Sequence, residues 1–288
     1  MLLTELGEPR KRMQSLTPPE STSSAGSVAT LTEATRTING VQLHYIIGQP
    51  AQPDPSRSPR RALLLHGWGG SIESWRPVTA DLLERGFHVV VVDFPGFGRS
   101  SPPPSAWGVP DYTETLIALI ESLAFAPSNI VAHSFGGRVA LILAATRPDL
   151  VKRLVLVSAA GIRTAAPSPL RRTAIKLGKA FFGLPGLAGI GEQIRTRMAS
   201  KDYLEAGILR ETFVRVIEQD LREYAARITH PTLLVWGDQD PETPLGQARI
   251  LESLIADSGL VILYGSGHFA YLEQLPRFTR ILAEFLKD

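Results

Sequence analysis

The stretch NIVAHSFGGRVALILAAT, residues 129–146, decides the fold. It begins with the short apolar run Ile130 to Ala132, which is typical of a strand buried on both faces. Two glycines follow almost at once, and a helical pattern then continues to Thr146. The stretch therefore predicts a strand that turns sharply into a helix, with Ser134 at the turn.

The same alternation extends in both directions from this stretch. Short apolar runs separated by helical patterns predict an α/β fold, in which a mostly parallel sheet is flanked by helices. The expected strands are 62–65, 89–92, 130–132, 154–157, 233–236 and 261–263, and the expected helices are 75–85, 112–124, 136–146 and 277–286. Ahead of them, β-rich runs on either side of Asn39-Gly40 predict a two-residue hairpin.

Two segments depart from this alternation. Ser, Thr, Pro and Glu dominate much of residues 1–34 without a sustained period, which predicts a disordered tail. Residues 162–228 carry helical patterns but no strand pattern, and a structureless loop of that length is improbable. We therefore predict a helical lid, or cap, inserted into an α/β core made of residues 35–161 and 229–288.

The composition narrows the classes of protein. The chain has 288 residues, of which 44% are hydrophobic and 20% charged, enough for a large core. A net charge of +2 without a recognisable basic module argues against nucleic acid as the main partner. The absence of Cys excludes disulfides, thiolate metal sites and a Cys nucleophile. Without a signal peptide or an apolar run of ~18 residues, we expect a soluble, cytoplasmic protein.

Ser134 stands where chemistry is expected in such a sheet. Ligands bind beyond the carboxyl ends of parallel strands, and a Ser at a sharp strand-to-helix turn forms a nucleophile elbow. The helix that follows points its free amides and the positive end of its dipole at the reacting centre. Ala132 replaces the first glycine of the G-x-S-x-G pattern. The alternative interpretation is a Gly-rich turn in which the Ser only caps the helix.

Candidates for an acid and a base follow two later strands. Of the two acids in WGDQDP (236–241), Asp240 lies deeper in the loop, and Asp238 is expected to cap the turn. His268 lies on the glycine-flanked loop GSGHF (265–269), and imidazole is suited to moving protons near neutral pH. The order Ser134, Asp240, His268 is the one expected of a catalytic triad in this fold.

A further loop offers hydrogen-bond donors for an oxyanion. HGWGG (66–70) follows the strand 62–65, and its glycines allow backbone amides to face a cavity. Acyl transfer needs two such donors for its tetrahedral intermediate. We predict the amides of Phe135 and Trp68, although HGWGG alone is also compatible with an ordinary turn.

Five motifs occur in order: HGWGG (66–70), DFPGFGRS (93–100), AHSFGG (132–137), WGDQD (236–240) and GSGHFAYLE (265–273). With them, the chain from about residue 35 to its end resembles the α/β-hydrolase fold family. The resemblance implies that Ser134 attacks an acyl carbonyl and that water activated through His268 hydrolyses the acyl-enzyme. No metal or organic cofactor is implied. Glu273 is expected to brace the His268 loop, and Asp93 to anchor its own.

The sequence of the predicted lid does not identify the substrate. From Arg163 to Lys201, eight basic residues stand against one acid, and an uncharged apolar stretch, 180–190, lies between them. One interpretation is a lid that packs its apolar side on the core. A second is a substrate pocket roofed by Phe181 and Phe182, in which nearby cations favour an anionic substrate. A third is transient contact with an anionic membrane surface.

The expected function is hydrolysis of an ester or a related acyl compound, with a small molecule as partner. Hydrolysis of a carbon–carbon bond and cofactor-free perhydrolysis are alternatives, because both use the same triad. A non-catalytic ligand-binding or accessory protein on the same scaffold is the alternative from another class.

Overall fold

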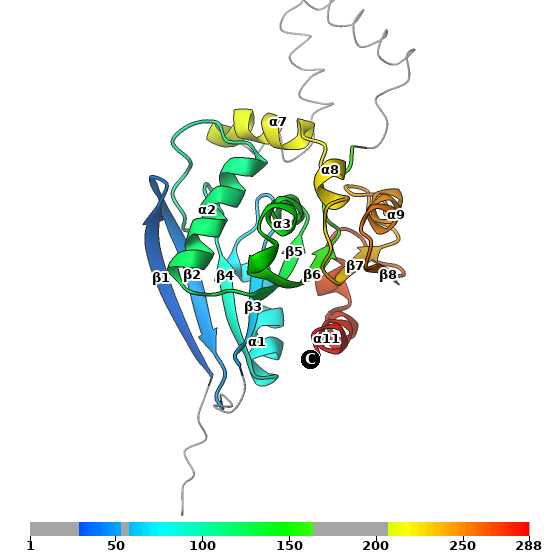
Figure 1. Ribbon diagram of the computed structural model, residues 1–288, viewed down its shortest axis with the longest axis horizontal. Coiled ribbons are helices and arrows are strands. Elements are labelled where there is room, and N and C mark those ends of the chain that lie inside the picture. Colours follow the sequence, from blue (N-terminus) through cyan, green and yellow to red (C-terminus); the bar gives the residue numbers. More distant parts are fainter. Residues whose placement is uncertain (1–28, 53–57, 164–206, 288) are drawn as a thin grey trace, which may run out of the picture.

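An eight-stranded sheet runs through the centre of the computed structural model, which describes residues 29–52, 58–163 and 207–287 (Figure 1). Its strands are β1 (Thr30–Ile38), β2 (Val41–Gln49), β3 (Arg60–Leu65), β4 (Phe87–Val92), β5 (Ser128–His133), β6 (Val151–Val157), β7 (Thr232–Gly237) and β8 (Ser258–Leu263). They lie side by side in the order β1-β2-β4-β3-β5-β6-β7-β8. From β4 to β8 all neighbours are parallel, whereas β2 is antiparallel to β1 and β4.

The antiparallel edge confirms the predicted hairpin. β1 and β2 pair from Ile38 with Val41 outward, and Asn39 and Gly40 between them both have positive φ, 51° and 77°. Two successive positive φ angles are what a tight hairpin turn requires. β1 begins at Thr30, so the last residues of the segment predicted as a tail belong to the sheet. The apolar signal is missing there because most of this edge strand is exposed.

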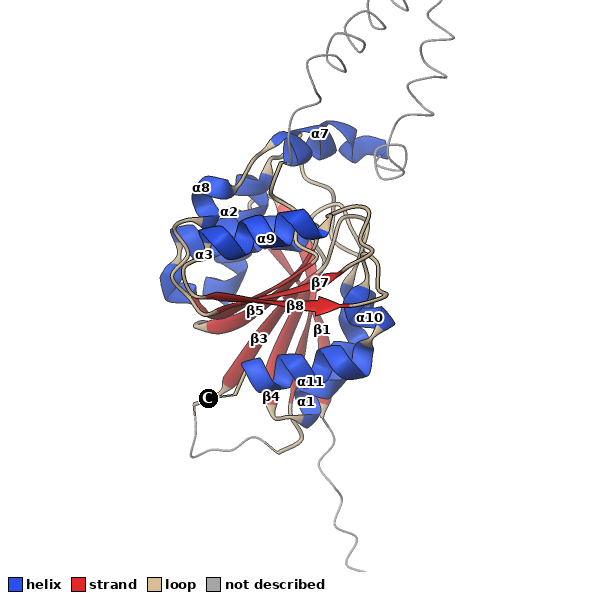
Figure 2. Cartoon of the chain, turned by 90° about the vertical axis from the view of Figure 1, so that its right-hand side faces the viewer, coloured by secondary structure: helices blue, strands red, loops and turns tan. Residues whose placement is uncertain are grey.

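Helices cover both faces of the sheet (Figures 1 and 2). One layer contains α2 (Val109–Ser122), α3 (Phe135–Thr146), α8 (Arg222–Ala225) and α9 (Leu245–Leu254), and the other contains α1 (Arg76–Glu84) and α11 (Leu275–Phe285). The further described helices are α7 (Arg210–Glu218), α10 (Ala270–Glu273) and the 3-10 turns Ile72–Trp75, Pro148–Leu150 and Gly207–Leu209. Two apolar clusters, one against each face, form the core.

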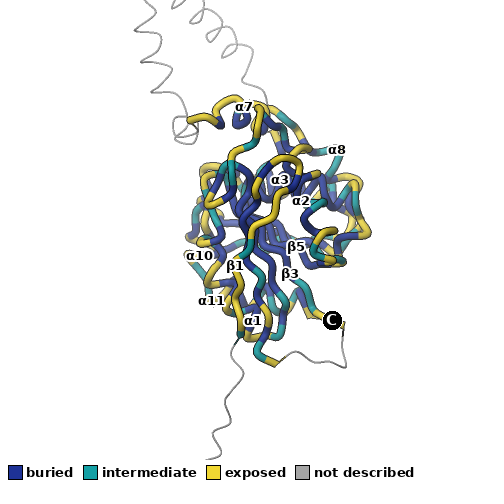
Figure 3. The backbone as a smooth tube through the Cα atoms, turned by 90° about the vertical axis from the view of Figure 1, so that its left-hand side faces the viewer, coloured by how far each residue is buried: buried dark blue, intermediate teal, exposed yellow. Residues whose placement is uncertain are grey.

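Burial explains which predicted elements are found. All six predicted strands are present, each longer than its apolar run, and the inner positions of all but the edge strand β8 are buried (Figure 3). The four predicted helices outside 162–228 are also present, whereas α9 and α10 were not predicted. Within the described residues, no helix combines the length and apolar character needed to cross a membrane.

Only part of the predicted lid is described. Residues 207–228 contain two helices, α7 and α8, within the segment 162–228 whose pattern was helical. The break between the two helices coincides with a tertiary hydrogen bond, in which the amide of Leu221 donates to the carbonyl of Gly161 at 2.9 Å. Phe181, Phe182 and the apolar stretch 180–190 lie outside the described residues.

Candidate active site

Ser134 occupies the turn between β5 and α3 in a backbone conformation that few side chains adopt. Its φ of 49° and ψ of −110° fall outside the regions that L residues prefer. The amide of Ser134 donates to the carbonyl of Val157 at 3.1 Å, and its carbonyl accepts from the amides of Gly137 and Ala160, both at 3.0 Å. The contacts with Val157 and Ala160, at the end of β6 and just after it, hold the strained turn in place.

The two glycines after Phe135 are required by close backbone approach. A Cβ atom on Gly136 would lie 2.6 Å from the carbonyl oxygen of Leu65, at the end of β3. A Cβ atom on Gly137 would lie 2.4 Å from the Cβ of Ala159. Any larger residue would push α3 away from the sheet, so the glycines place Ser134 at the carboxyl ends of the strands. At the position before the elbow, the methyl group of Ala132 is completely buried.

Asp240 and His268 form a buried pair. Oδ2 of Asp240 lies 2.9 Å from Nδ1 of His268, and the hydroxyl of Thr243 donates to the same oxygen at 2.7 Å. Oδ1 accepts from the amides of Glu242 and Thr243, both at 2.9 Å. Burial by itself would raise the pKa of Asp240, but hydrogen bonds from His268 and Thr243 outweigh it and lower the pKa to about 2. The ionised carboxylate therefore fixes the proton of His268 on Nδ1.

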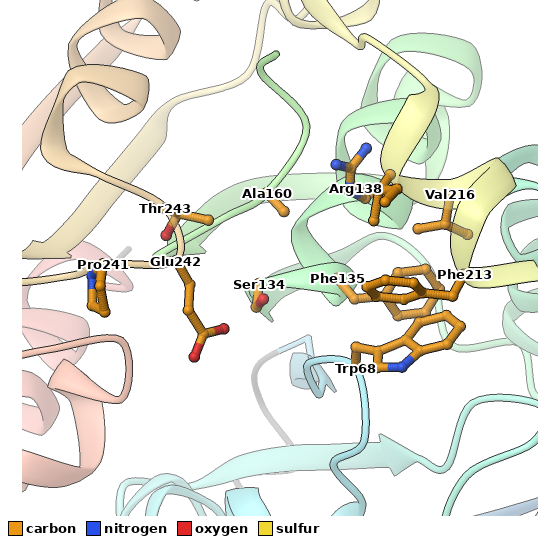
Figure 4. Close-up of a pocket in the computed structure, with 11 residues that line it drawn as sticks. Trp68, Ser134, Phe135, Arg138, Ala160, Phe213, Val216, Pro241, Glu242 and Thr243 are labelled. Atoms are coloured by element: carbon orange, nitrogen blue, oxygen red, sulfur yellow. The ribbon is translucent and has the colours of Figure 1, made fainter. Parts of the chain in front are cut away.

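The other nitrogen of His268 faces a second carboxylate. Its Nε2 lies 3.3 Å from Oε2 of Glu242. Among the described residues, no hydrogen bond joins Nε2 to Oγ of Ser134. Both Ser134 and Glu242 line one cavity, and Figure 4 shows them on neighbouring parts of its wall. Catalytic hydrogen bonds are often formed only when substrate is bound, so this geometry is compatible with an acid–base role for His268.

The remaining acids near these loops hold the loops together. Asp238 is exposed, and its Oδ1 accepts from the amide of Gly265 at 2.6 Å, which ties the loop after β7 to the loop after β8. Oε2 of Glu273 accepts from the amide of Gly267 at 3.0 Å, the brace that the sequence predicted. Within this loop region, Asp240 is thus the acid that contacts His268 Nδ1.

Two further imidazoles lie beneath the site and are neutral. Nε2 of His133 donates to the carbonyl of His268 at 3.0 Å, and burial lowers the pKa of His133 to about 3. Nδ1 of His66 donates to the carbonyl of Gly67 at 2.7 Å, and its Nε2 accepts from the amide of Phe94 at 3.0 Å. Burial lowers the pKa of His66 to about 4. Both residues therefore support loops around the site.

Asp93 anchors the loop that follows β4, also as predicted. Its buried carboxylate accepts from the amides of Ile72 at 2.8 Å and Arg99 at 2.9 Å, and Nδ1 of His44 lies 2.8 Å from it. A Cβ atom on Gly98 would lie 2.2 Å from the carboxylate carbon. The loop therefore wraps tightly around Asp93, which takes no part in the cavity.

The two predicted oxyanion donors lie beside Ser134. Phe135 is the first residue of α3, and Trp68 lies in a turn closed by a 3.0 Å hydrogen bond from the amide of Gly70 to the carbonyl of Gly67. Neither the amide of Phe135 nor that of Trp68 donates to another described residue. Both residues line the cavity that contains Ser134. Their role as oxyanion donors stays a prediction.

The cavity has a volume of about 560 Å³ and one aromatic wall (Figure 4). The ring of Trp68 contacts those of Phe97, Phe135 and Phe213, with centroids 4.8, 5.4 and 5.0 Å apart. The described residues that line the cavity are Trp68, Ser134, Phe135, Arg138, Ala160, Phe213, Val216, Ile217, Pro241, Glu242 and Thr243.

Sequence reasoning missed several of these residues. Phe213 and Val216 supply an apolar wall from α7 and had no role in the sequence prediction. The roof of Phe181 and Phe182, one of three interpretations, lies outside the described residues. The sequence signal that could have found Phe213 and Val216 is the amphipathic pattern of α7, whose apolar side is buried. Arg138 was missed because it lies inside a helix. Its Nη1 donates to the carbonyl of Gln219 at 2.9 Å, and burial lowers its pKa to about 10, so it remains charged at neutral pH.

Comparisons with known proteins agree with the fold. Residues 63–187 match the family model described as alpha/beta hydrolase fold, and residues 215–288 match the model described as TAP-like protein. The chain belongs to the α/β-hydrolase fold family. The described part of this family member contains no cluster of potential metal ligands, that is, no group of three or more His, Cys, Asp or Glu side chains placed to hold a metal ion.

Three proteins that are similar to this chain carry different names. An uncharacterized protein from Mycobacterium bovis is 28% identical over 254 residues, 78% of this chain and 74% of that one. A 2-hydroxy-6-oxononadienedioate/2-hydroxy-6-oxononatrienedioate hydrolase from Burkholderia vietnamiensis is 25% identical over 252 residues, 78% and 86% of the two chains. The crystal structure of the enol-lactonase from Burkholderia xenovorans LB400 matches with a TM-score of 0.66 and 25% identity, covering 88% of this chain and 100% of that one.

Proposed function

We propose that this family member is a serine hydrolase that cleaves a carboxylic ester or a related acyl compound. Ser134 is the nucleophile, His268 the general base and acid, and Asp240 the carboxylate that orients His268. The observation that supports this most is the strained Ser134, which lines a cavity at the carboxyl ends of the strands beside the Asp240–His268 pair. A serine that only capped a helix would need neither a strained backbone nor a neighbouring Asp–His pair.

In the first half of the reaction, Oγ of Ser134 attacks the carbonyl carbon of the substrate, and its proton passes to Nε2 of His268. Asp240 keeps the proton of the neutral imidazole on Nδ1, which leaves the lone pair of Nε2 free, and then stabilises the imidazolium. The amides of Phe135 and Trp68 donate to the oxyanion. The bond to the leaving oxygen breaks, and Nε2 returns a proton to that oxygen, which leaves an acyl group on Ser134.

In the second half, water takes the place of the leaving alcohol. Nε2 of His268 removes a proton from the water as its oxygen attacks the acyl carbon. The tetrahedral intermediate then collapses, the bond to Oγ of Ser134 breaks, and Oγ regains its proton from His268. The products are a carboxylic acid and an alcohol, and no cofactor is consumed.

The cavity supports a small to medium, partly apolar substrate. Its volume of about 560 Å³ lies in the range of small-molecule sites. The aromatic wall of Trp68, Phe135 and Phe213 offers apolar surface next to Ser134. The enol-lactonase neighbour is named for an ester-containing substrate class, which is in keeping with this proposal.

Hydrolysis of a carbon–carbon bond is the second candidate. Relatives such as the B. vietnamiensis protein are named as hydrolases of 2-hydroxy-6-oxo-dienedioates, which are carbon–carbon bond substrates. The same three residues serve that chemistry. Cofactor-free perhydrolysis uses them too, but nothing described favours it.

Hydrolysis of p-nitrophenyl esters from acetate to decanoate, by the wild type and Ser134→Ala side by side, tests the proposal. We expect wild-type turnover, loss of turnover in the variant, and a chain-length optimum that reflects the cavity. A 2-hydroxy-6-oxo-dienoate substrate is assayed in parallel, and a much higher kcat/KM for it would favour the carbon–carbon candidate. Turnover by Ser134→Ala equal to that of the wild type would refute the role of Ser134.

A further inference from the structure

Glu242 lies on the cavity wall next to His268. Its backbone is fixed by the loop that holds the acid, since its amide donates to Oδ1 of Asp240 at 2.9 Å. Its side chain is 54% exposed, lines the cavity with Ser134, and brings Oε2 to 3.3 Å from Nε2 of His268 (Figure 4). No motif in the sequence singles out this residue.

Glu242 and Ser134 compete for one nitrogen atom. In the neutral imidazole, Nδ1 carries the proton that Asp240 accepts, so Nε2 presents a lone pair, which a carboxylate repels. A 3.3 Å contact between Nε2 and Oε2 therefore suits the protonated imidazole. Ser134 needs the lone pair of the same nitrogen, so the carboxylate of Glu242 must turn aside for the reaction. Its exposure allows this, and among the described residues His268 is its side chain's one polar partner.

The path of the leaving group follows from the proton transfer. Nε2 of His268 returns a proton to the leaving oxygen, which must then lie about 3 Å from it. That oxygen therefore lies within about 6 Å of the position that the carboxylate of Glu242 occupies in this structure, 3.3 Å from Nε2, and a carboxylate that turns aside still belongs to the same cavity wall. The other charged residue among those described on the cavity wall, Arg138, is held by the carbonyl of Gln219. Among the described residues that line the cavity, the exposed charge next to Nε2 is therefore negative.

We propose that Glu242 is a specificity-determining residue, which favours substrates whose leaving group carries a cationic group and disfavours those whose leaving group carries an anion. This inference rests on the proposed function, because it assumes that His268 protonates the leaving group. Attraction between the carboxylate of Glu242 and a cationic group about 6 Å away, at a half-exposed site, should raise kcat/KM by about tenfold. Since the carboxylate is exposed, salt should weaken the preference.

The test compares leaving groups of nearly equal shape. Acetate esters of choline and of 3,3-dimethylbutanol differ in a trimethylammonium group and its uncharged tert-butyl counterpart, and the acetate ester of 4-hydroxybutanoate supplies an anionic leaving group. Acid release is followed in a pH-stat at low and high salt. The proteins are the wild type, Glu242→Gln, Ser134→Ala and the control Glu284→Gln. The control removes the same charge from an exposed position on α11, across the sheet from α7 (Figure 2).

We expect the wild type at low salt to hydrolyse the choline ester about tenfold more efficiently than its neutral counterpart, and the anionic ester less efficiently than either. Glu242→Gln should bring the cationic-to-neutral ratio close to one, whereas Glu284→Gln should keep the wild-type ratio. A wild-type ratio near one, or a preference that survives in Glu242→Gln, would overturn the inference alone. Wild-type acid release no faster than that of Ser134→Ala for all three esters would overturn the proposed function and the inference with it.

Discussion

Replacing Asp240 with Asn should invert the tautomer of the catalytic imidazole. Oδ1 of Asp240 accepts two backbone amides, those of Glu242 and Thr243, and only an oxygen can fill that position. The Asn side chain will therefore keep its oxygen there and turn its NH₂ group toward Nδ1 of His268, which lies 2.9 Å from Oδ2. Nδ1 must then accept, so the proton moves to Nε2, and His268 can no longer receive the proton of Ser134.

The size of the effect follows from this inversion. A wrong imidazole tautomer in a serine triad lowers kcat by about 10⁴-fold, or roughly 5 kcal/mol of transition-state stabilisation. The fold should survive, since the Asn retains both backbone hydrogen bonds, and we expect a loss of about 1–3 kcal/mol in the free energy of unfolding from the weakened pair with His268. Activity should therefore fall far more than stability.

Asp238→Asn is the matched control. Asp238 is exposed and accepts from the amide of Gly265, a contact that the oxygen of Asn can keep. Its kcat with a p-nitrophenyl ester should stay within about threefold of the wild type. Stopped assays for kcat and urea unfolding for stability are run on both variants. If Asp238→Asn loses as much activity as Asp240→Asn, or if Asp240→Asn retains more than a tenth of wild-type kcat, Asp240 is not the orienting acid.

Three further predictions concern the elbow, the buried imidazoles and the cavity wall. Gly136→Ala places a Cβ atom 2.6 Å from the carbonyl oxygen of Leu65 and should cost about 1–3 kcal/mol in urea unfolding; wild-type stability would contradict the close approach. Burial lowers the pKa values of His66 and His133 to about 4 and about 3, so the unfolded chain binds more protons below about pH 6.5. The free energy of unfolding should then fall by roughly 2–3 kcal/mol per unit as the pH drops from about 6.5 toward 4, and His133→Gln should halve that slope; a flat profile would refute the neutral state of both. Phe213→Ala should move the acyl chain-length optimum of p-nitrophenyl esters to longer chains, and an unchanged optimum would show that α7 does not bound the acyl site.

The parallel centre of the sheet could be predicted because burial there leaves a direct trace in the sequence. β5 and β7 are buried at every position, so each contains an unbroken apolar run. The elbow was predictable for a related reason, since Gly136 and Gly137 approach Leu65 and Ala159 too closely for any side chain, which leaves two glycines as a trace in the sequence. β1 was predicted too short because an exposed edge strand places few demands on residue type.

The contacts that join distant loops could not be predicted from the sequence. In WGDQD, position in the loop favoured Asp240 over Asp238, but the partners of the two acids, His268 and Gly265, become visible only in the folded loops. Glu242 carries no local signal, because its position depends on how the loops after β7 and β8 meet. The break between α7 and α8 likewise follows from a contact with Gly161 rather than from helix propensity.

Covalent labelling of Ser134 tests the central claim most directly. A fluorophosphonate reacts only with a serine whose proton is removed by a neighbouring base, and the adduct is measured by intact mass and located by peptide mapping. We predict one adduct per wild-type chain, on the peptide that contains Ser134, with none in Ser134→Ala and a strongly slowed reaction in Asp240→Asn. A wild-type chain that stays unlabelled, or that is labelled at another serine, would contradict the assignment of Ser134 as the nucleophile.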